Sequence, residues 1–148
     1  MVKSAKVESR VVKGQKPNPT AGMRHVALFV ADLDAACFFY IDLLGMAIEW
    51  QPDAENIYLC SGNDNVALHH NPDSTQLDSA RQRLDHIGFI IDDIDDVDRW
   101  YDFLKSNDVK MKSEPRTHRD GARSFYCLDP AGTVVQIIFH PPLSGKRA

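Results

Sequence analysis

Residues 25–45, HVALFVADLDAACFFYIDLLG, align without a gap on residues 86–106, HIGFIIDDIDDVDRWYDFLKS. Five of these 21 aligned pairs are identical, whereas average residue frequencies give about one by chance. The identical pairs are His25/His86, Asp32/Asp93, Asp34/Asp95, Tyr40/Tyr101 and Leu43/Leu104. A second, weaker match places residues 58–70 on residues 126–138. The sequence therefore predicts an internal duplication.

Each half of the duplication is predicted to form a strand, a helix and three further strands. Residues 24–31 are β-branched and apolar, which is typical of a buried strand. Asp32 and Asp34 favour the start of a helix, which the apolar spacing continues as far as Gly45. The other predicted strands are 46–51, 56–61 and 65–70 in the first half, and 85–91, 109–113, 123–128 and 133–140 in the second, around a helix at 95–106.

This pattern predicts an α+β protein made of two βαβββ modules. Residues 21–70 form the first predicted module and residues 84–142 the second, with a polar linker at 71–83. Residues 1–20 are predicted to be a flexible basic tail, because they contain five basic residues and one Glu without any sustained apolar period. Residues 143–148 form a short C-terminal tail.

Composition excludes several classes of partner. The chain has a net charge of −4, and the excess of acidic residues lies outside the first 20 residues, which argues against nucleic acid as the main partner. The longest apolar run, residues 35–41, is far shorter than the ~18 residues that a membrane span needs. Without an apolar signal segment at the N-terminus, a cytoplasmic location is expected.

His25 and His86 are the first candidates for chemistry, because they begin equivalent strands. Alternation places His25, Ala27 and Phe29 on one face, and the more aliphatic opposite face suits packing under the helix. Imidazole is both the commonest metal ligand and the commonest general base. The two histidines either serve such chemistry or are hydrogen-bonded residues inherited from one ancestor. On the final strand the second half offers Gln136, whereas the repeat predicts Leu68 at the equivalent position.

The two repeated blocks, together with the ending FYCLDPAGTVVQIIF, resemble the vicinal oxygen chelate superfamily. This superfamily includes glyoxalase I, bleomycin and fosfomycin resistance proteins, methylmalonyl-CoA epimerase and extradiol dioxygenases. The resemblance covers about residues 21–142 and implies paired βαβββ modules, which is the architecture predicted above. It leaves the chemistry open, because one scaffold hosts several activities.

The resemblance also implies where a metal would bind. In metal-binding members the ligands occupy the first and last strand of each module, positions that correspond here to His25, Leu68, His86 and Gln136. Members of glyoxalase or epimerase type use carboxylates there to hold the metal and move a proton, and neither Leu68 nor a neutral Gln136 can accept a proton. Extradiol dioxygenases hold Fe(II) with two histidines and one carboxylate, and here Gln136 stands at the carboxylate position.

Two further residues resemble the dioxygenases. Tyr126 stands at the position of their active-site tyrosine, and His118 is one residue short of the position of their acid/base histidine. The stretch THRDGARSFYCLDPAG therefore resembles the dioxygenases more than the glyoxalases.

Three functions remain open from the sequence. The first is a metal-dependent, extradiol dioxygenase-like enzyme using Fe2+ bound by His25, His86 and Gln136, with His118 and Tyr126 as catalytic residues. The second is a glyoxalase-type lyase or isomerase using Mn2+, Ni2+ or Zn2+, with Glu49 as the one candidate base. The third is a metal-free protein that binds a small molecule, as in antibiotic resistance. The resemblance also implies a small-molecule substrate and a homodimer.

Overall fold

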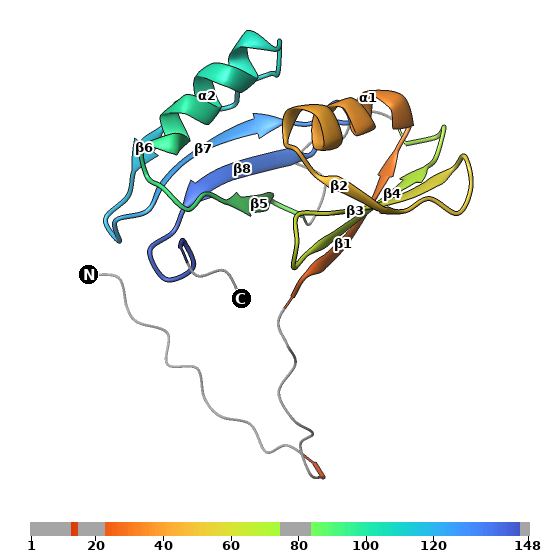
Figure 1. The fold of residues 1–148 in the computed structure, drawn as a ribbon, viewed down its shortest axis with the longest axis horizontal. Coiled ribbons are helices and arrows are strands. Elements are labelled where there is room, and N and C mark those ends of the chain that lie inside the picture. The colour runs from red at the N-terminus through yellow and green to blue at the C-terminus, as the bar shows by residue number, and fades with distance from the viewer. Residues whose placement is uncertain (1–12, 15–22, 75–83, 146–148) are drawn as a thin grey trace.

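The computed structural model describes residues 13–14, 23–74 and 84–145. Nearly all of the predicted basic tail and most of the predicted linker at 71–83 lie outside these residues, as does the end of the predicted tail at 143–148. Two mixed four-stranded sheets and few helices make up the described part, as Figure 1 shows. The α+β class and the paired βαβββ modules are therefore confirmed.

The first module contains six elements. They are β1 (His25–Val30), α1 (Leu33–Cys37), η1 (Phe38–Leu43), β2 (Ala47–Trp50), β3 (Asn56–Cys60) and β4 (Asn65–His70). The strand order is β1-β4-β3-β2, with β1 parallel to β4 and the other neighbours antiparallel. Strand β4 lies inside the sheet. Its side chains alternate between the core and the opposite surface, as in any strand.

The second module repeats this arrangement. Its elements are β5 (Ile87–Ile90), α2 (Asp96–Ser106), β6 (Arg116–Thr117), β7 (Arg123–Leu128) and β8 (Val134–Phe139). The strand order β5-β8-β7-β6 matches the first sheet, and β5 is parallel to β8. Helix α2 packs against β7 and β8. The bidentate pair of Arg123 with Asp98, at 2.7 Å for both bonds, ties the start of β7 to α2.

The strand predicted at 109–113 is wrong. Only Met111 makes a bridge, to Cys127, and the short strand β6 at Arg116–Thr117 pairs with β7 instead. The backbone N–H groups of Lys112 and Ser113 both donate to the Tyr126 carbonyl, at 2.8 and 3.2 Å. Two successive donors on one acceptor cannot continue an antiparallel ladder, in which neighbouring residues point their N–H groups to opposite sides.

The helix of the first module begins and ends where the sequence predicts. The Asp32 carboxylate accepts from the Ala35 N–H at 2.9 Å, and Gly45 takes a φ of 76°, which favours glycine. Between them the α-helix ends at Cys37 and continues as the π-helix η1, which the apolar spacing did not reveal.

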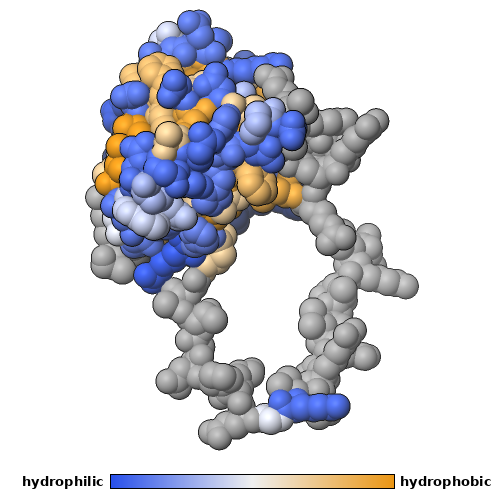
Figure 2. Space-filling view, turned by 90° about the vertical axis from the view of Figure 1, so that its right-hand side faces the viewer, coloured by the Kyte–Doolittle hydropathy of each residue, from blue (hydrophilic) through white to orange (hydrophobic). Residues whose placement is uncertain are grey.

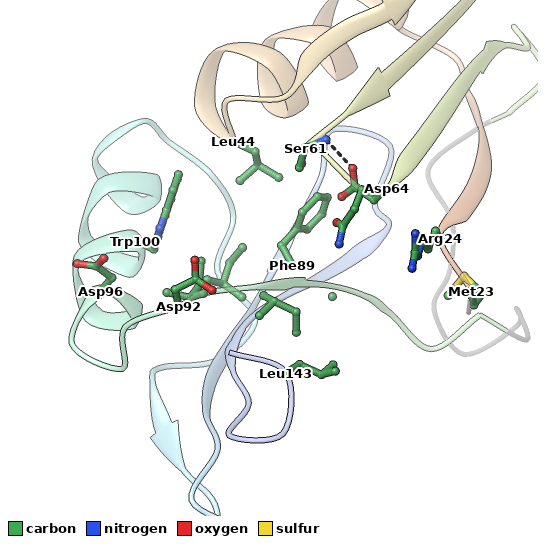
Figure 3. A pocket seen from close by; sticks show the side chains of 16 residues that line it. Met23, Arg24, Leu44, Ser61, Asp64, Phe89, Asp92, Asp96, Trp100 and Leu143 are labelled. Carbon is green, nitrogen blue, oxygen red and sulfur yellow. Dashed lines mark hydrogen bonds between the residues drawn. The ribbon is translucent and has the colours of Figure 1, made fainter. Parts of the chain in front are cut away.

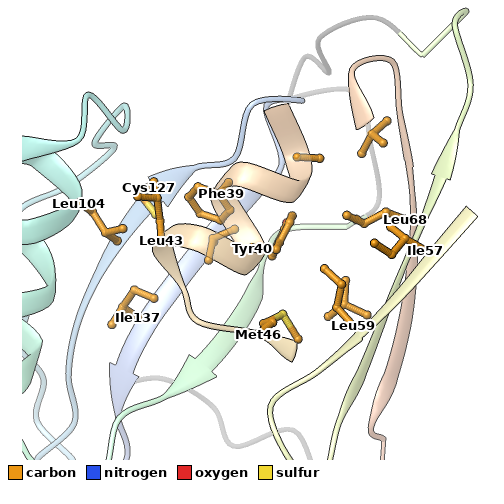
Figure 4. Close-up of a cluster of buried hydrophobic side chains, with 14 of the residues drawn as sticks. Phe39, Tyr40, Leu43, Met46, Ile57, Leu59, Leu68, Leu104, Cys127 and Ile137 are labelled. Atoms are coloured by element: carbon orange, nitrogen blue, oxygen red, sulfur yellow. The ribbon is translucent and has the colours of Figure 1, made fainter. Parts of the chain in front are cut away.

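The core is one cluster to which both modules contribute. Figure 4 shows Phe39, Tyr40 and Leu43 of the first helix lying between Ile57, Leu59 and Leu68 of the first sheet and Leu104, Cys127 and Ile137 of the second module. The buried Tyr40 hydroxyl donates to the Asp129 carboxylate at 2.8 Å, which links η1 to the β7–β8 turn. The first helix is thus packed between the two sheets.

Burial raises the pKa of Asp129, against the hydrogen bonds from Tyr40 and the turn backbone that lower it. Burial and the nearby Asp129 raise the pKa of Tyr40 as well, and burial raises the pKa of Cys127 to about 12. Cys127 is therefore an inert buried thiol.

None of the helices in the described segments has the length and apolar character needed to cross a bilayer.

Candidate functional site

Both candidate histidines lie on the sheet faces turned away from the shared core. Along β1 exposure alternates, so that His25, Ala27 and Phe29 are exposed while Val26, Leu28 and Val30 turn inward. Strand β5 alternates in the same way, with Gly88 and Ile90 exposed. The predicted division of each first strand into a histidine face and a core face is confirmed.

In the second module, Gln136 lies at the centre of a buried hydrogen-bond network. Its amide nitrogen donates to the Ser124 hydroxyl and to the Tyr126 hydroxyl, each at 3.0 Å. Its carbonyl oxygen faces Gly88 on the neighbouring strand β5, where an added Cβ would lie 3.7 Å from Oε1. Gln136 is only 9% exposed, so this oxygen is held in one direction.

His118 joins the same network through Ser124. Its Nε2 lies 3.0 Å from the Ser124 hydroxyl, and its backbone N–H donates to the Ala122 carbonyl at 2.7 Å. A hydroxyl can donate to a neutral imidazole nitrogen and accept from a protonated one. Ser124 can therefore hold His118 in place in both protonation states.

His86 lies beside Tyr126. The two rings meet edge to face with centroids 5.2 Å apart, and the Nδ1 of His86 is 2.5 Å from the Asp85 carboxylate. Because a carboxylate only accepts hydrogen bonds, Nδ1 carries a proton, and in the neutral imidazole Nε2 then keeps its lone pair. His86, His118, Tyr126 and Gln136, all predicted from the sequence, thus gather in one place.

His25 belongs to a separate group in the first module. Its Nδ1 lies 2.6 Å from Oδ1 of Asn65, and the amide nitrogen of Asn65 donates to the Glu49 carboxylate. These three residues come from β1, β4 and β2. Glu49, the one base suggested for a glyoxalase-type reaction, is therefore already engaged by Asn65.

The equivalence of Leu68 with Gln136 is wrong. Gly88 pairs with Gln136, and Ala27, its counterpart in the repeat, pairs with Ala67. Leu68 instead pairs with Leu28, faces the core and is fully buried. The connection between β3 and β4 is one residue shorter than that between β7 and β8, and a shift of one residue moves a side chain to the other face of a strand.

The three candidate metal ligands are divided between the two modules. Within the described residues, no three His, Cys, Asp or Glu side chains are grouped so that they could hold a metal ion. The second module offers an imidazole nitrogen from His86 and an amide oxygen from Gln136, and the first offers an imidazole nitrogen from His25. Imidazole suits Zn, Cu, Fe and Ni, whereas a carbonyl oxygen suits harder cations such as Mg, Ca and Mn.

The sequence analysis did not predict Asn65 or Ser124. Asn65 connects His25 to Glu49, and Ser124 connects His118 to Gln136. Ser124 lies two residues before Tyr126 on β7, so alternation alone places it on the same face. Asn65 is the first residue of β4 and pairs with His25 in the parallel register, a contact that only the sheet topology reveals.

A hollow with a volume of about 790 Å³ lies between the modules. Figure 3 shows Leu44, Phe89 and Trp100 around it, with Arg24, Asp92 and Leu143 further along its wall. Asp64 at its rim accepts from the Ser61 N–H. The imidazoles of His25, His86 and His118 do not line this hollow, but Gly88, which Oε1 of Gln136 faces, does.

Comparison with known proteins agrees with this architecture. Residues 22–137 match the model of the Glyoxalase/Bleomycin resistance protein/Dioxygenase superfamily. The chain belongs to this superfamily. Within the superfamily, it is 29% identical to metallothiol transferase FosB of Staphylococcus epidermidis over 118 residues, which cover 78% of this chain and 79% of that protein.

A second relative in the superfamily is 3-methylcatechol 2,3-dioxygenase of Pseudomonas putida. It is 32% identical over 124 residues, which cover 78% of this chain and 40% of the dioxygenase. The chain therefore matches less than half of the length of that enzyme.

Solved structures of the superfamily share the fold. A glyoxalase/dioxygenase from Nostoc punctiforme matches with a TM-score of 0.73 at 22% identity, covering 89% of this chain and 99% of that one. Lactoylglutathione lyase from Agrobacterium tumefaciens matches with a TM-score of 0.67 at 24% identity, covering 82% of this chain and 96% of that one.

Proposed function

We propose that this protein is a metal-dependent enzyme that acts on a small molecule by extradiol dioxygenase-type chemistry. The observation that carries the proposal is the network of His118, Ser124, Gln136 and Tyr126 beside His86. It joins the candidate acid/base, the candidate substrate-binding hydroxyl and two candidate metal ligands. The similarity to a catechol dioxygenase supports the same reaction class.

The proposed ligands are Nε2 of His25, Nε2 of His86 and Oε1 of Gln136. A bound Fe2+ ion would supply Lewis-acid charge and hold the oxygen atoms of a catechol in place. The orientation of Gln136 suits this role, because its amide nitrogen is occupied by two hydroxyls and its oxygen is not the atom that contacts them.

Tyr126 and His118 would act on the substrate. The Tyr126 oxygen accepts from Gln136, so its own proton remains for an oxygen atom of the substrate. His118 would exchange a proton with the substrate hydroxyl, and Ser124 would keep the ring in place as its charge changes.

Oxygen consumption tests this function. Protein loaded with Fe2+ under anaerobic conditions is expected to consume oxygen when catechol is added, and His118→Gln is expected to slow the reaction by about 100-fold or more. His70→Gln is the matched control, because His70 pairs with Glu55 outside the network. Iron-loaded protein that consumes no oxygen with catechols would overturn the dioxygenase proposal.

We also propose that two copies pair to complete the site. The His25 face and the Gln136 face are both turned away from the core that the modules share, and in the proposed pair a second chain brings the two donor groups together. The first sheet also exposes Phe29 and Trp50, at 63% and 58%. Figure 2 views the molecule from the right-hand side of Figure 1 and shows hydrophobic patches among hydrophilic side chains.

Mixing two inactive variants tests the pairing. His25→Ala and His86→Ala chains are each expected to lose metal binding, whereas a refolded mixture should recover a part of it. Recovery follows because one chain then supplies His86 and the other supplies His25 at an intact site. A mixture that binds as little metal as its components would contradict a site shared between chains.

A further inference from the structure

The group around His25 contains a carboxylate that the superfamily resemblance does not assign. Glu49 lies on the edge strand β2 at the point where its register with β3 shifts, between Ile48 and Trp50. Such an irregularity re-aims a side chain. From this position Glu49 contacts Asn65 on β4, two strands away in the sheet order.

The donors and acceptors in this chain of contacts can have only one arrangement. Glu49 as a carboxylate only accepts, so the end of Asn65 that touches it is the NH2 group. The other end of Asn65 is therefore the carbonyl oxygen, which also only accepts. The Nδ1 of His25 at 2.6 Å must carry the proton, and the neutral imidazole keeps its lone pair on Nε2.

The two modules thus reach the same histidine tautomer by different means. In the second module the Asp85 carboxylate holds Nδ1 of His86 directly. In the first module the carboxylate acts through Asn65, the partner of His25 in the parallel register. Arg24 is the one Lys or Arg between residues 23 and 74, so the first module has many more acidic than basic side chains.

We propose that Asn65 and Glu49 are positioning residues that present Nε2 of His25 to the metal. They would also place a negative charge behind this ligand, where the neutral Gln136 contributes none. This inference rests on the proposed function. Carboxylates and amides that hold the far nitrogen of a metal-binding histidine orient the ring and raise its basicity, and losing one typically costs about 10–100-fold in metal affinity.

The tautomer of His25 tests the contacts without any metal. In 15N NMR spectra of the metal-free protein, above the pH at which His25 is charged, we expect the proton on Nδ1. In Asn65→Leu the resonances should move toward those of the other tautomer. A proton on Nε2 in the wild type, or an unchanged spectrum in Asn65→Leu, would overturn the proposal.

Metal affinity tests the consequence of these contacts. Glu49→Gln keeps the size of the side chain and removes its charge, and it is expected to weaken Co2+ or Fe2+ binding by about 10–100-fold. Glu55→Gln is the matched control, since Glu55 is also a carboxylate of the first module that contacts a histidine, His70. Its affinity should match the wild type. Because Glu49 is exposed, the exchange leaves the core intact.

The outcomes separate this inference from the proposed function. If wild-type protein binds the ions and Glu49→Gln binds them equally well, the positioning role is overturned while the metal site stands. If wild-type protein binds none of the ions, the metal-dependent function fails, and the inference that rests on it fails too.

Discussion

The two modules descend from one repeated pattern, yet they build different surfaces on equivalent strands. Where the second module has Gln136, the first has Ala67, and where the second holds its histidine with Asp85, the first uses Asn65 and Glu49. The second module carries the polar network of His118, Ser124, Tyr126 and Gln136, and the first exposes the aromatic rings of Phe29 and Trp50. Trp50 stacks on Tyr58 there at 5.1 Å between ring centroids.

The two modules thus share the scaffold and the histidine, while the remaining residues of their outer faces differ. A strand has two faces, and the core face must fit the shared cluster, which restricts its residues to apolar ones. The opposite face has no such constraint. In the proposed site the two modules therefore contribute unlike groups: two ligands and a proton-transfer residue from the second, and one ligand with a negative charge behind it from the first.

The largest effect is expected from removing the histidine of either module. His86→Ala should abolish stoichiometric binding of a divalent metal and leave the fold intact, because the ring lies outside the core cluster. Isothermal titration with Co2+ and a circular dichroism spectrum measure both properties. His25→Ala should behave in the same way, and full metal occupancy in either variant would break the proposed equivalence of the two histidines.

Leu68→Ala tests whether the core face of β4 affects stability alone and not metal binding. Leu68 is fully buried against the first helix, so its truncation is expected to lower the free energy of unfolding by about 2–5 kcal/mol. Metal affinity of the folded protein should not change, because Leu68 lies on the core face. Denaturant unfolding and metal titration give the two values, and a loss of affinity in the folded variant would return Leu68 to the site.

Removing the hydrogen bond between Tyr40 and Asp129, which links the two modules, is expected to have a smaller effect on stability. Tyr40→Phe leaves Asp129 without the 2.8 Å bond from the tyrosine and is expected to cost about 1–3 kcal/mol of unfolding free energy. Chemical denaturation measures this loss. A variant as stable as the wild type would show that the link between η1 and the β7–β8 turn adds nothing.

Asp129 also makes stability depend on pH in a defined direction. Its pKa is raised in the folded protein by burial, so the folded state binds its proton more tightly than the unfolded state. The contribution of this group is present below the unfolded pKa and is lost as pH rises through the folded pKa. Asp129→Asn should remove this decline from unfolding curves measured above about pH 4. An identical pH dependence in both proteins would contradict it.

Gln136→Glu tests whether the outer face of the second module supplies a metal ligand that the first module, with Ala67, lacks. A charged ligand in place of a neutral one is expected to tighten divalent metal binding by roughly tenfold. The hydroxyls of Ser124 and Tyr126, which now accept from Gln136, can turn to donate to a carboxylate. Titration with Co2+ measures the change, and an unchanged affinity would place Gln136 outside the ligand set.

Much of this architecture could be predicted from the sequence because it depends on local patterns. The bounds of β4 and β7 agree with the predicted strands, and Asp32 and Gly45 mark the ends of the first helix. The predicted strand at 109–113 failed because its backbone donors converge on one carbonyl, a geometry that no periodicity encodes.

The candidate site could be predicted only in part, for a similar reason. The repeat predicts His86 and Gln136, the resemblance to the superfamily implies His118 and Tyr126, and the structure brings the four together. The equivalent of Gln136 in the first module was misplaced by one residue, because loop lengths differ between the modules. The contact from Glu49 to Asn65 crosses the sheet, so it depends on strand order and on an irregular register.

The number of metal ions bound per chain shows whether both modules supply ligands to one metal site. Metal-free protein titrated anaerobically with Fe2+ is expected to bind one ion per chain, with the binding lost in both His25→Ala and His86→Ala. This result would show that each module supplies a ligand. Wild-type protein that binds no Fe2+, Mn2+, Ni2+ or Zn2+ would contradict the account and favour a metal-free binding protein on the same scaffold.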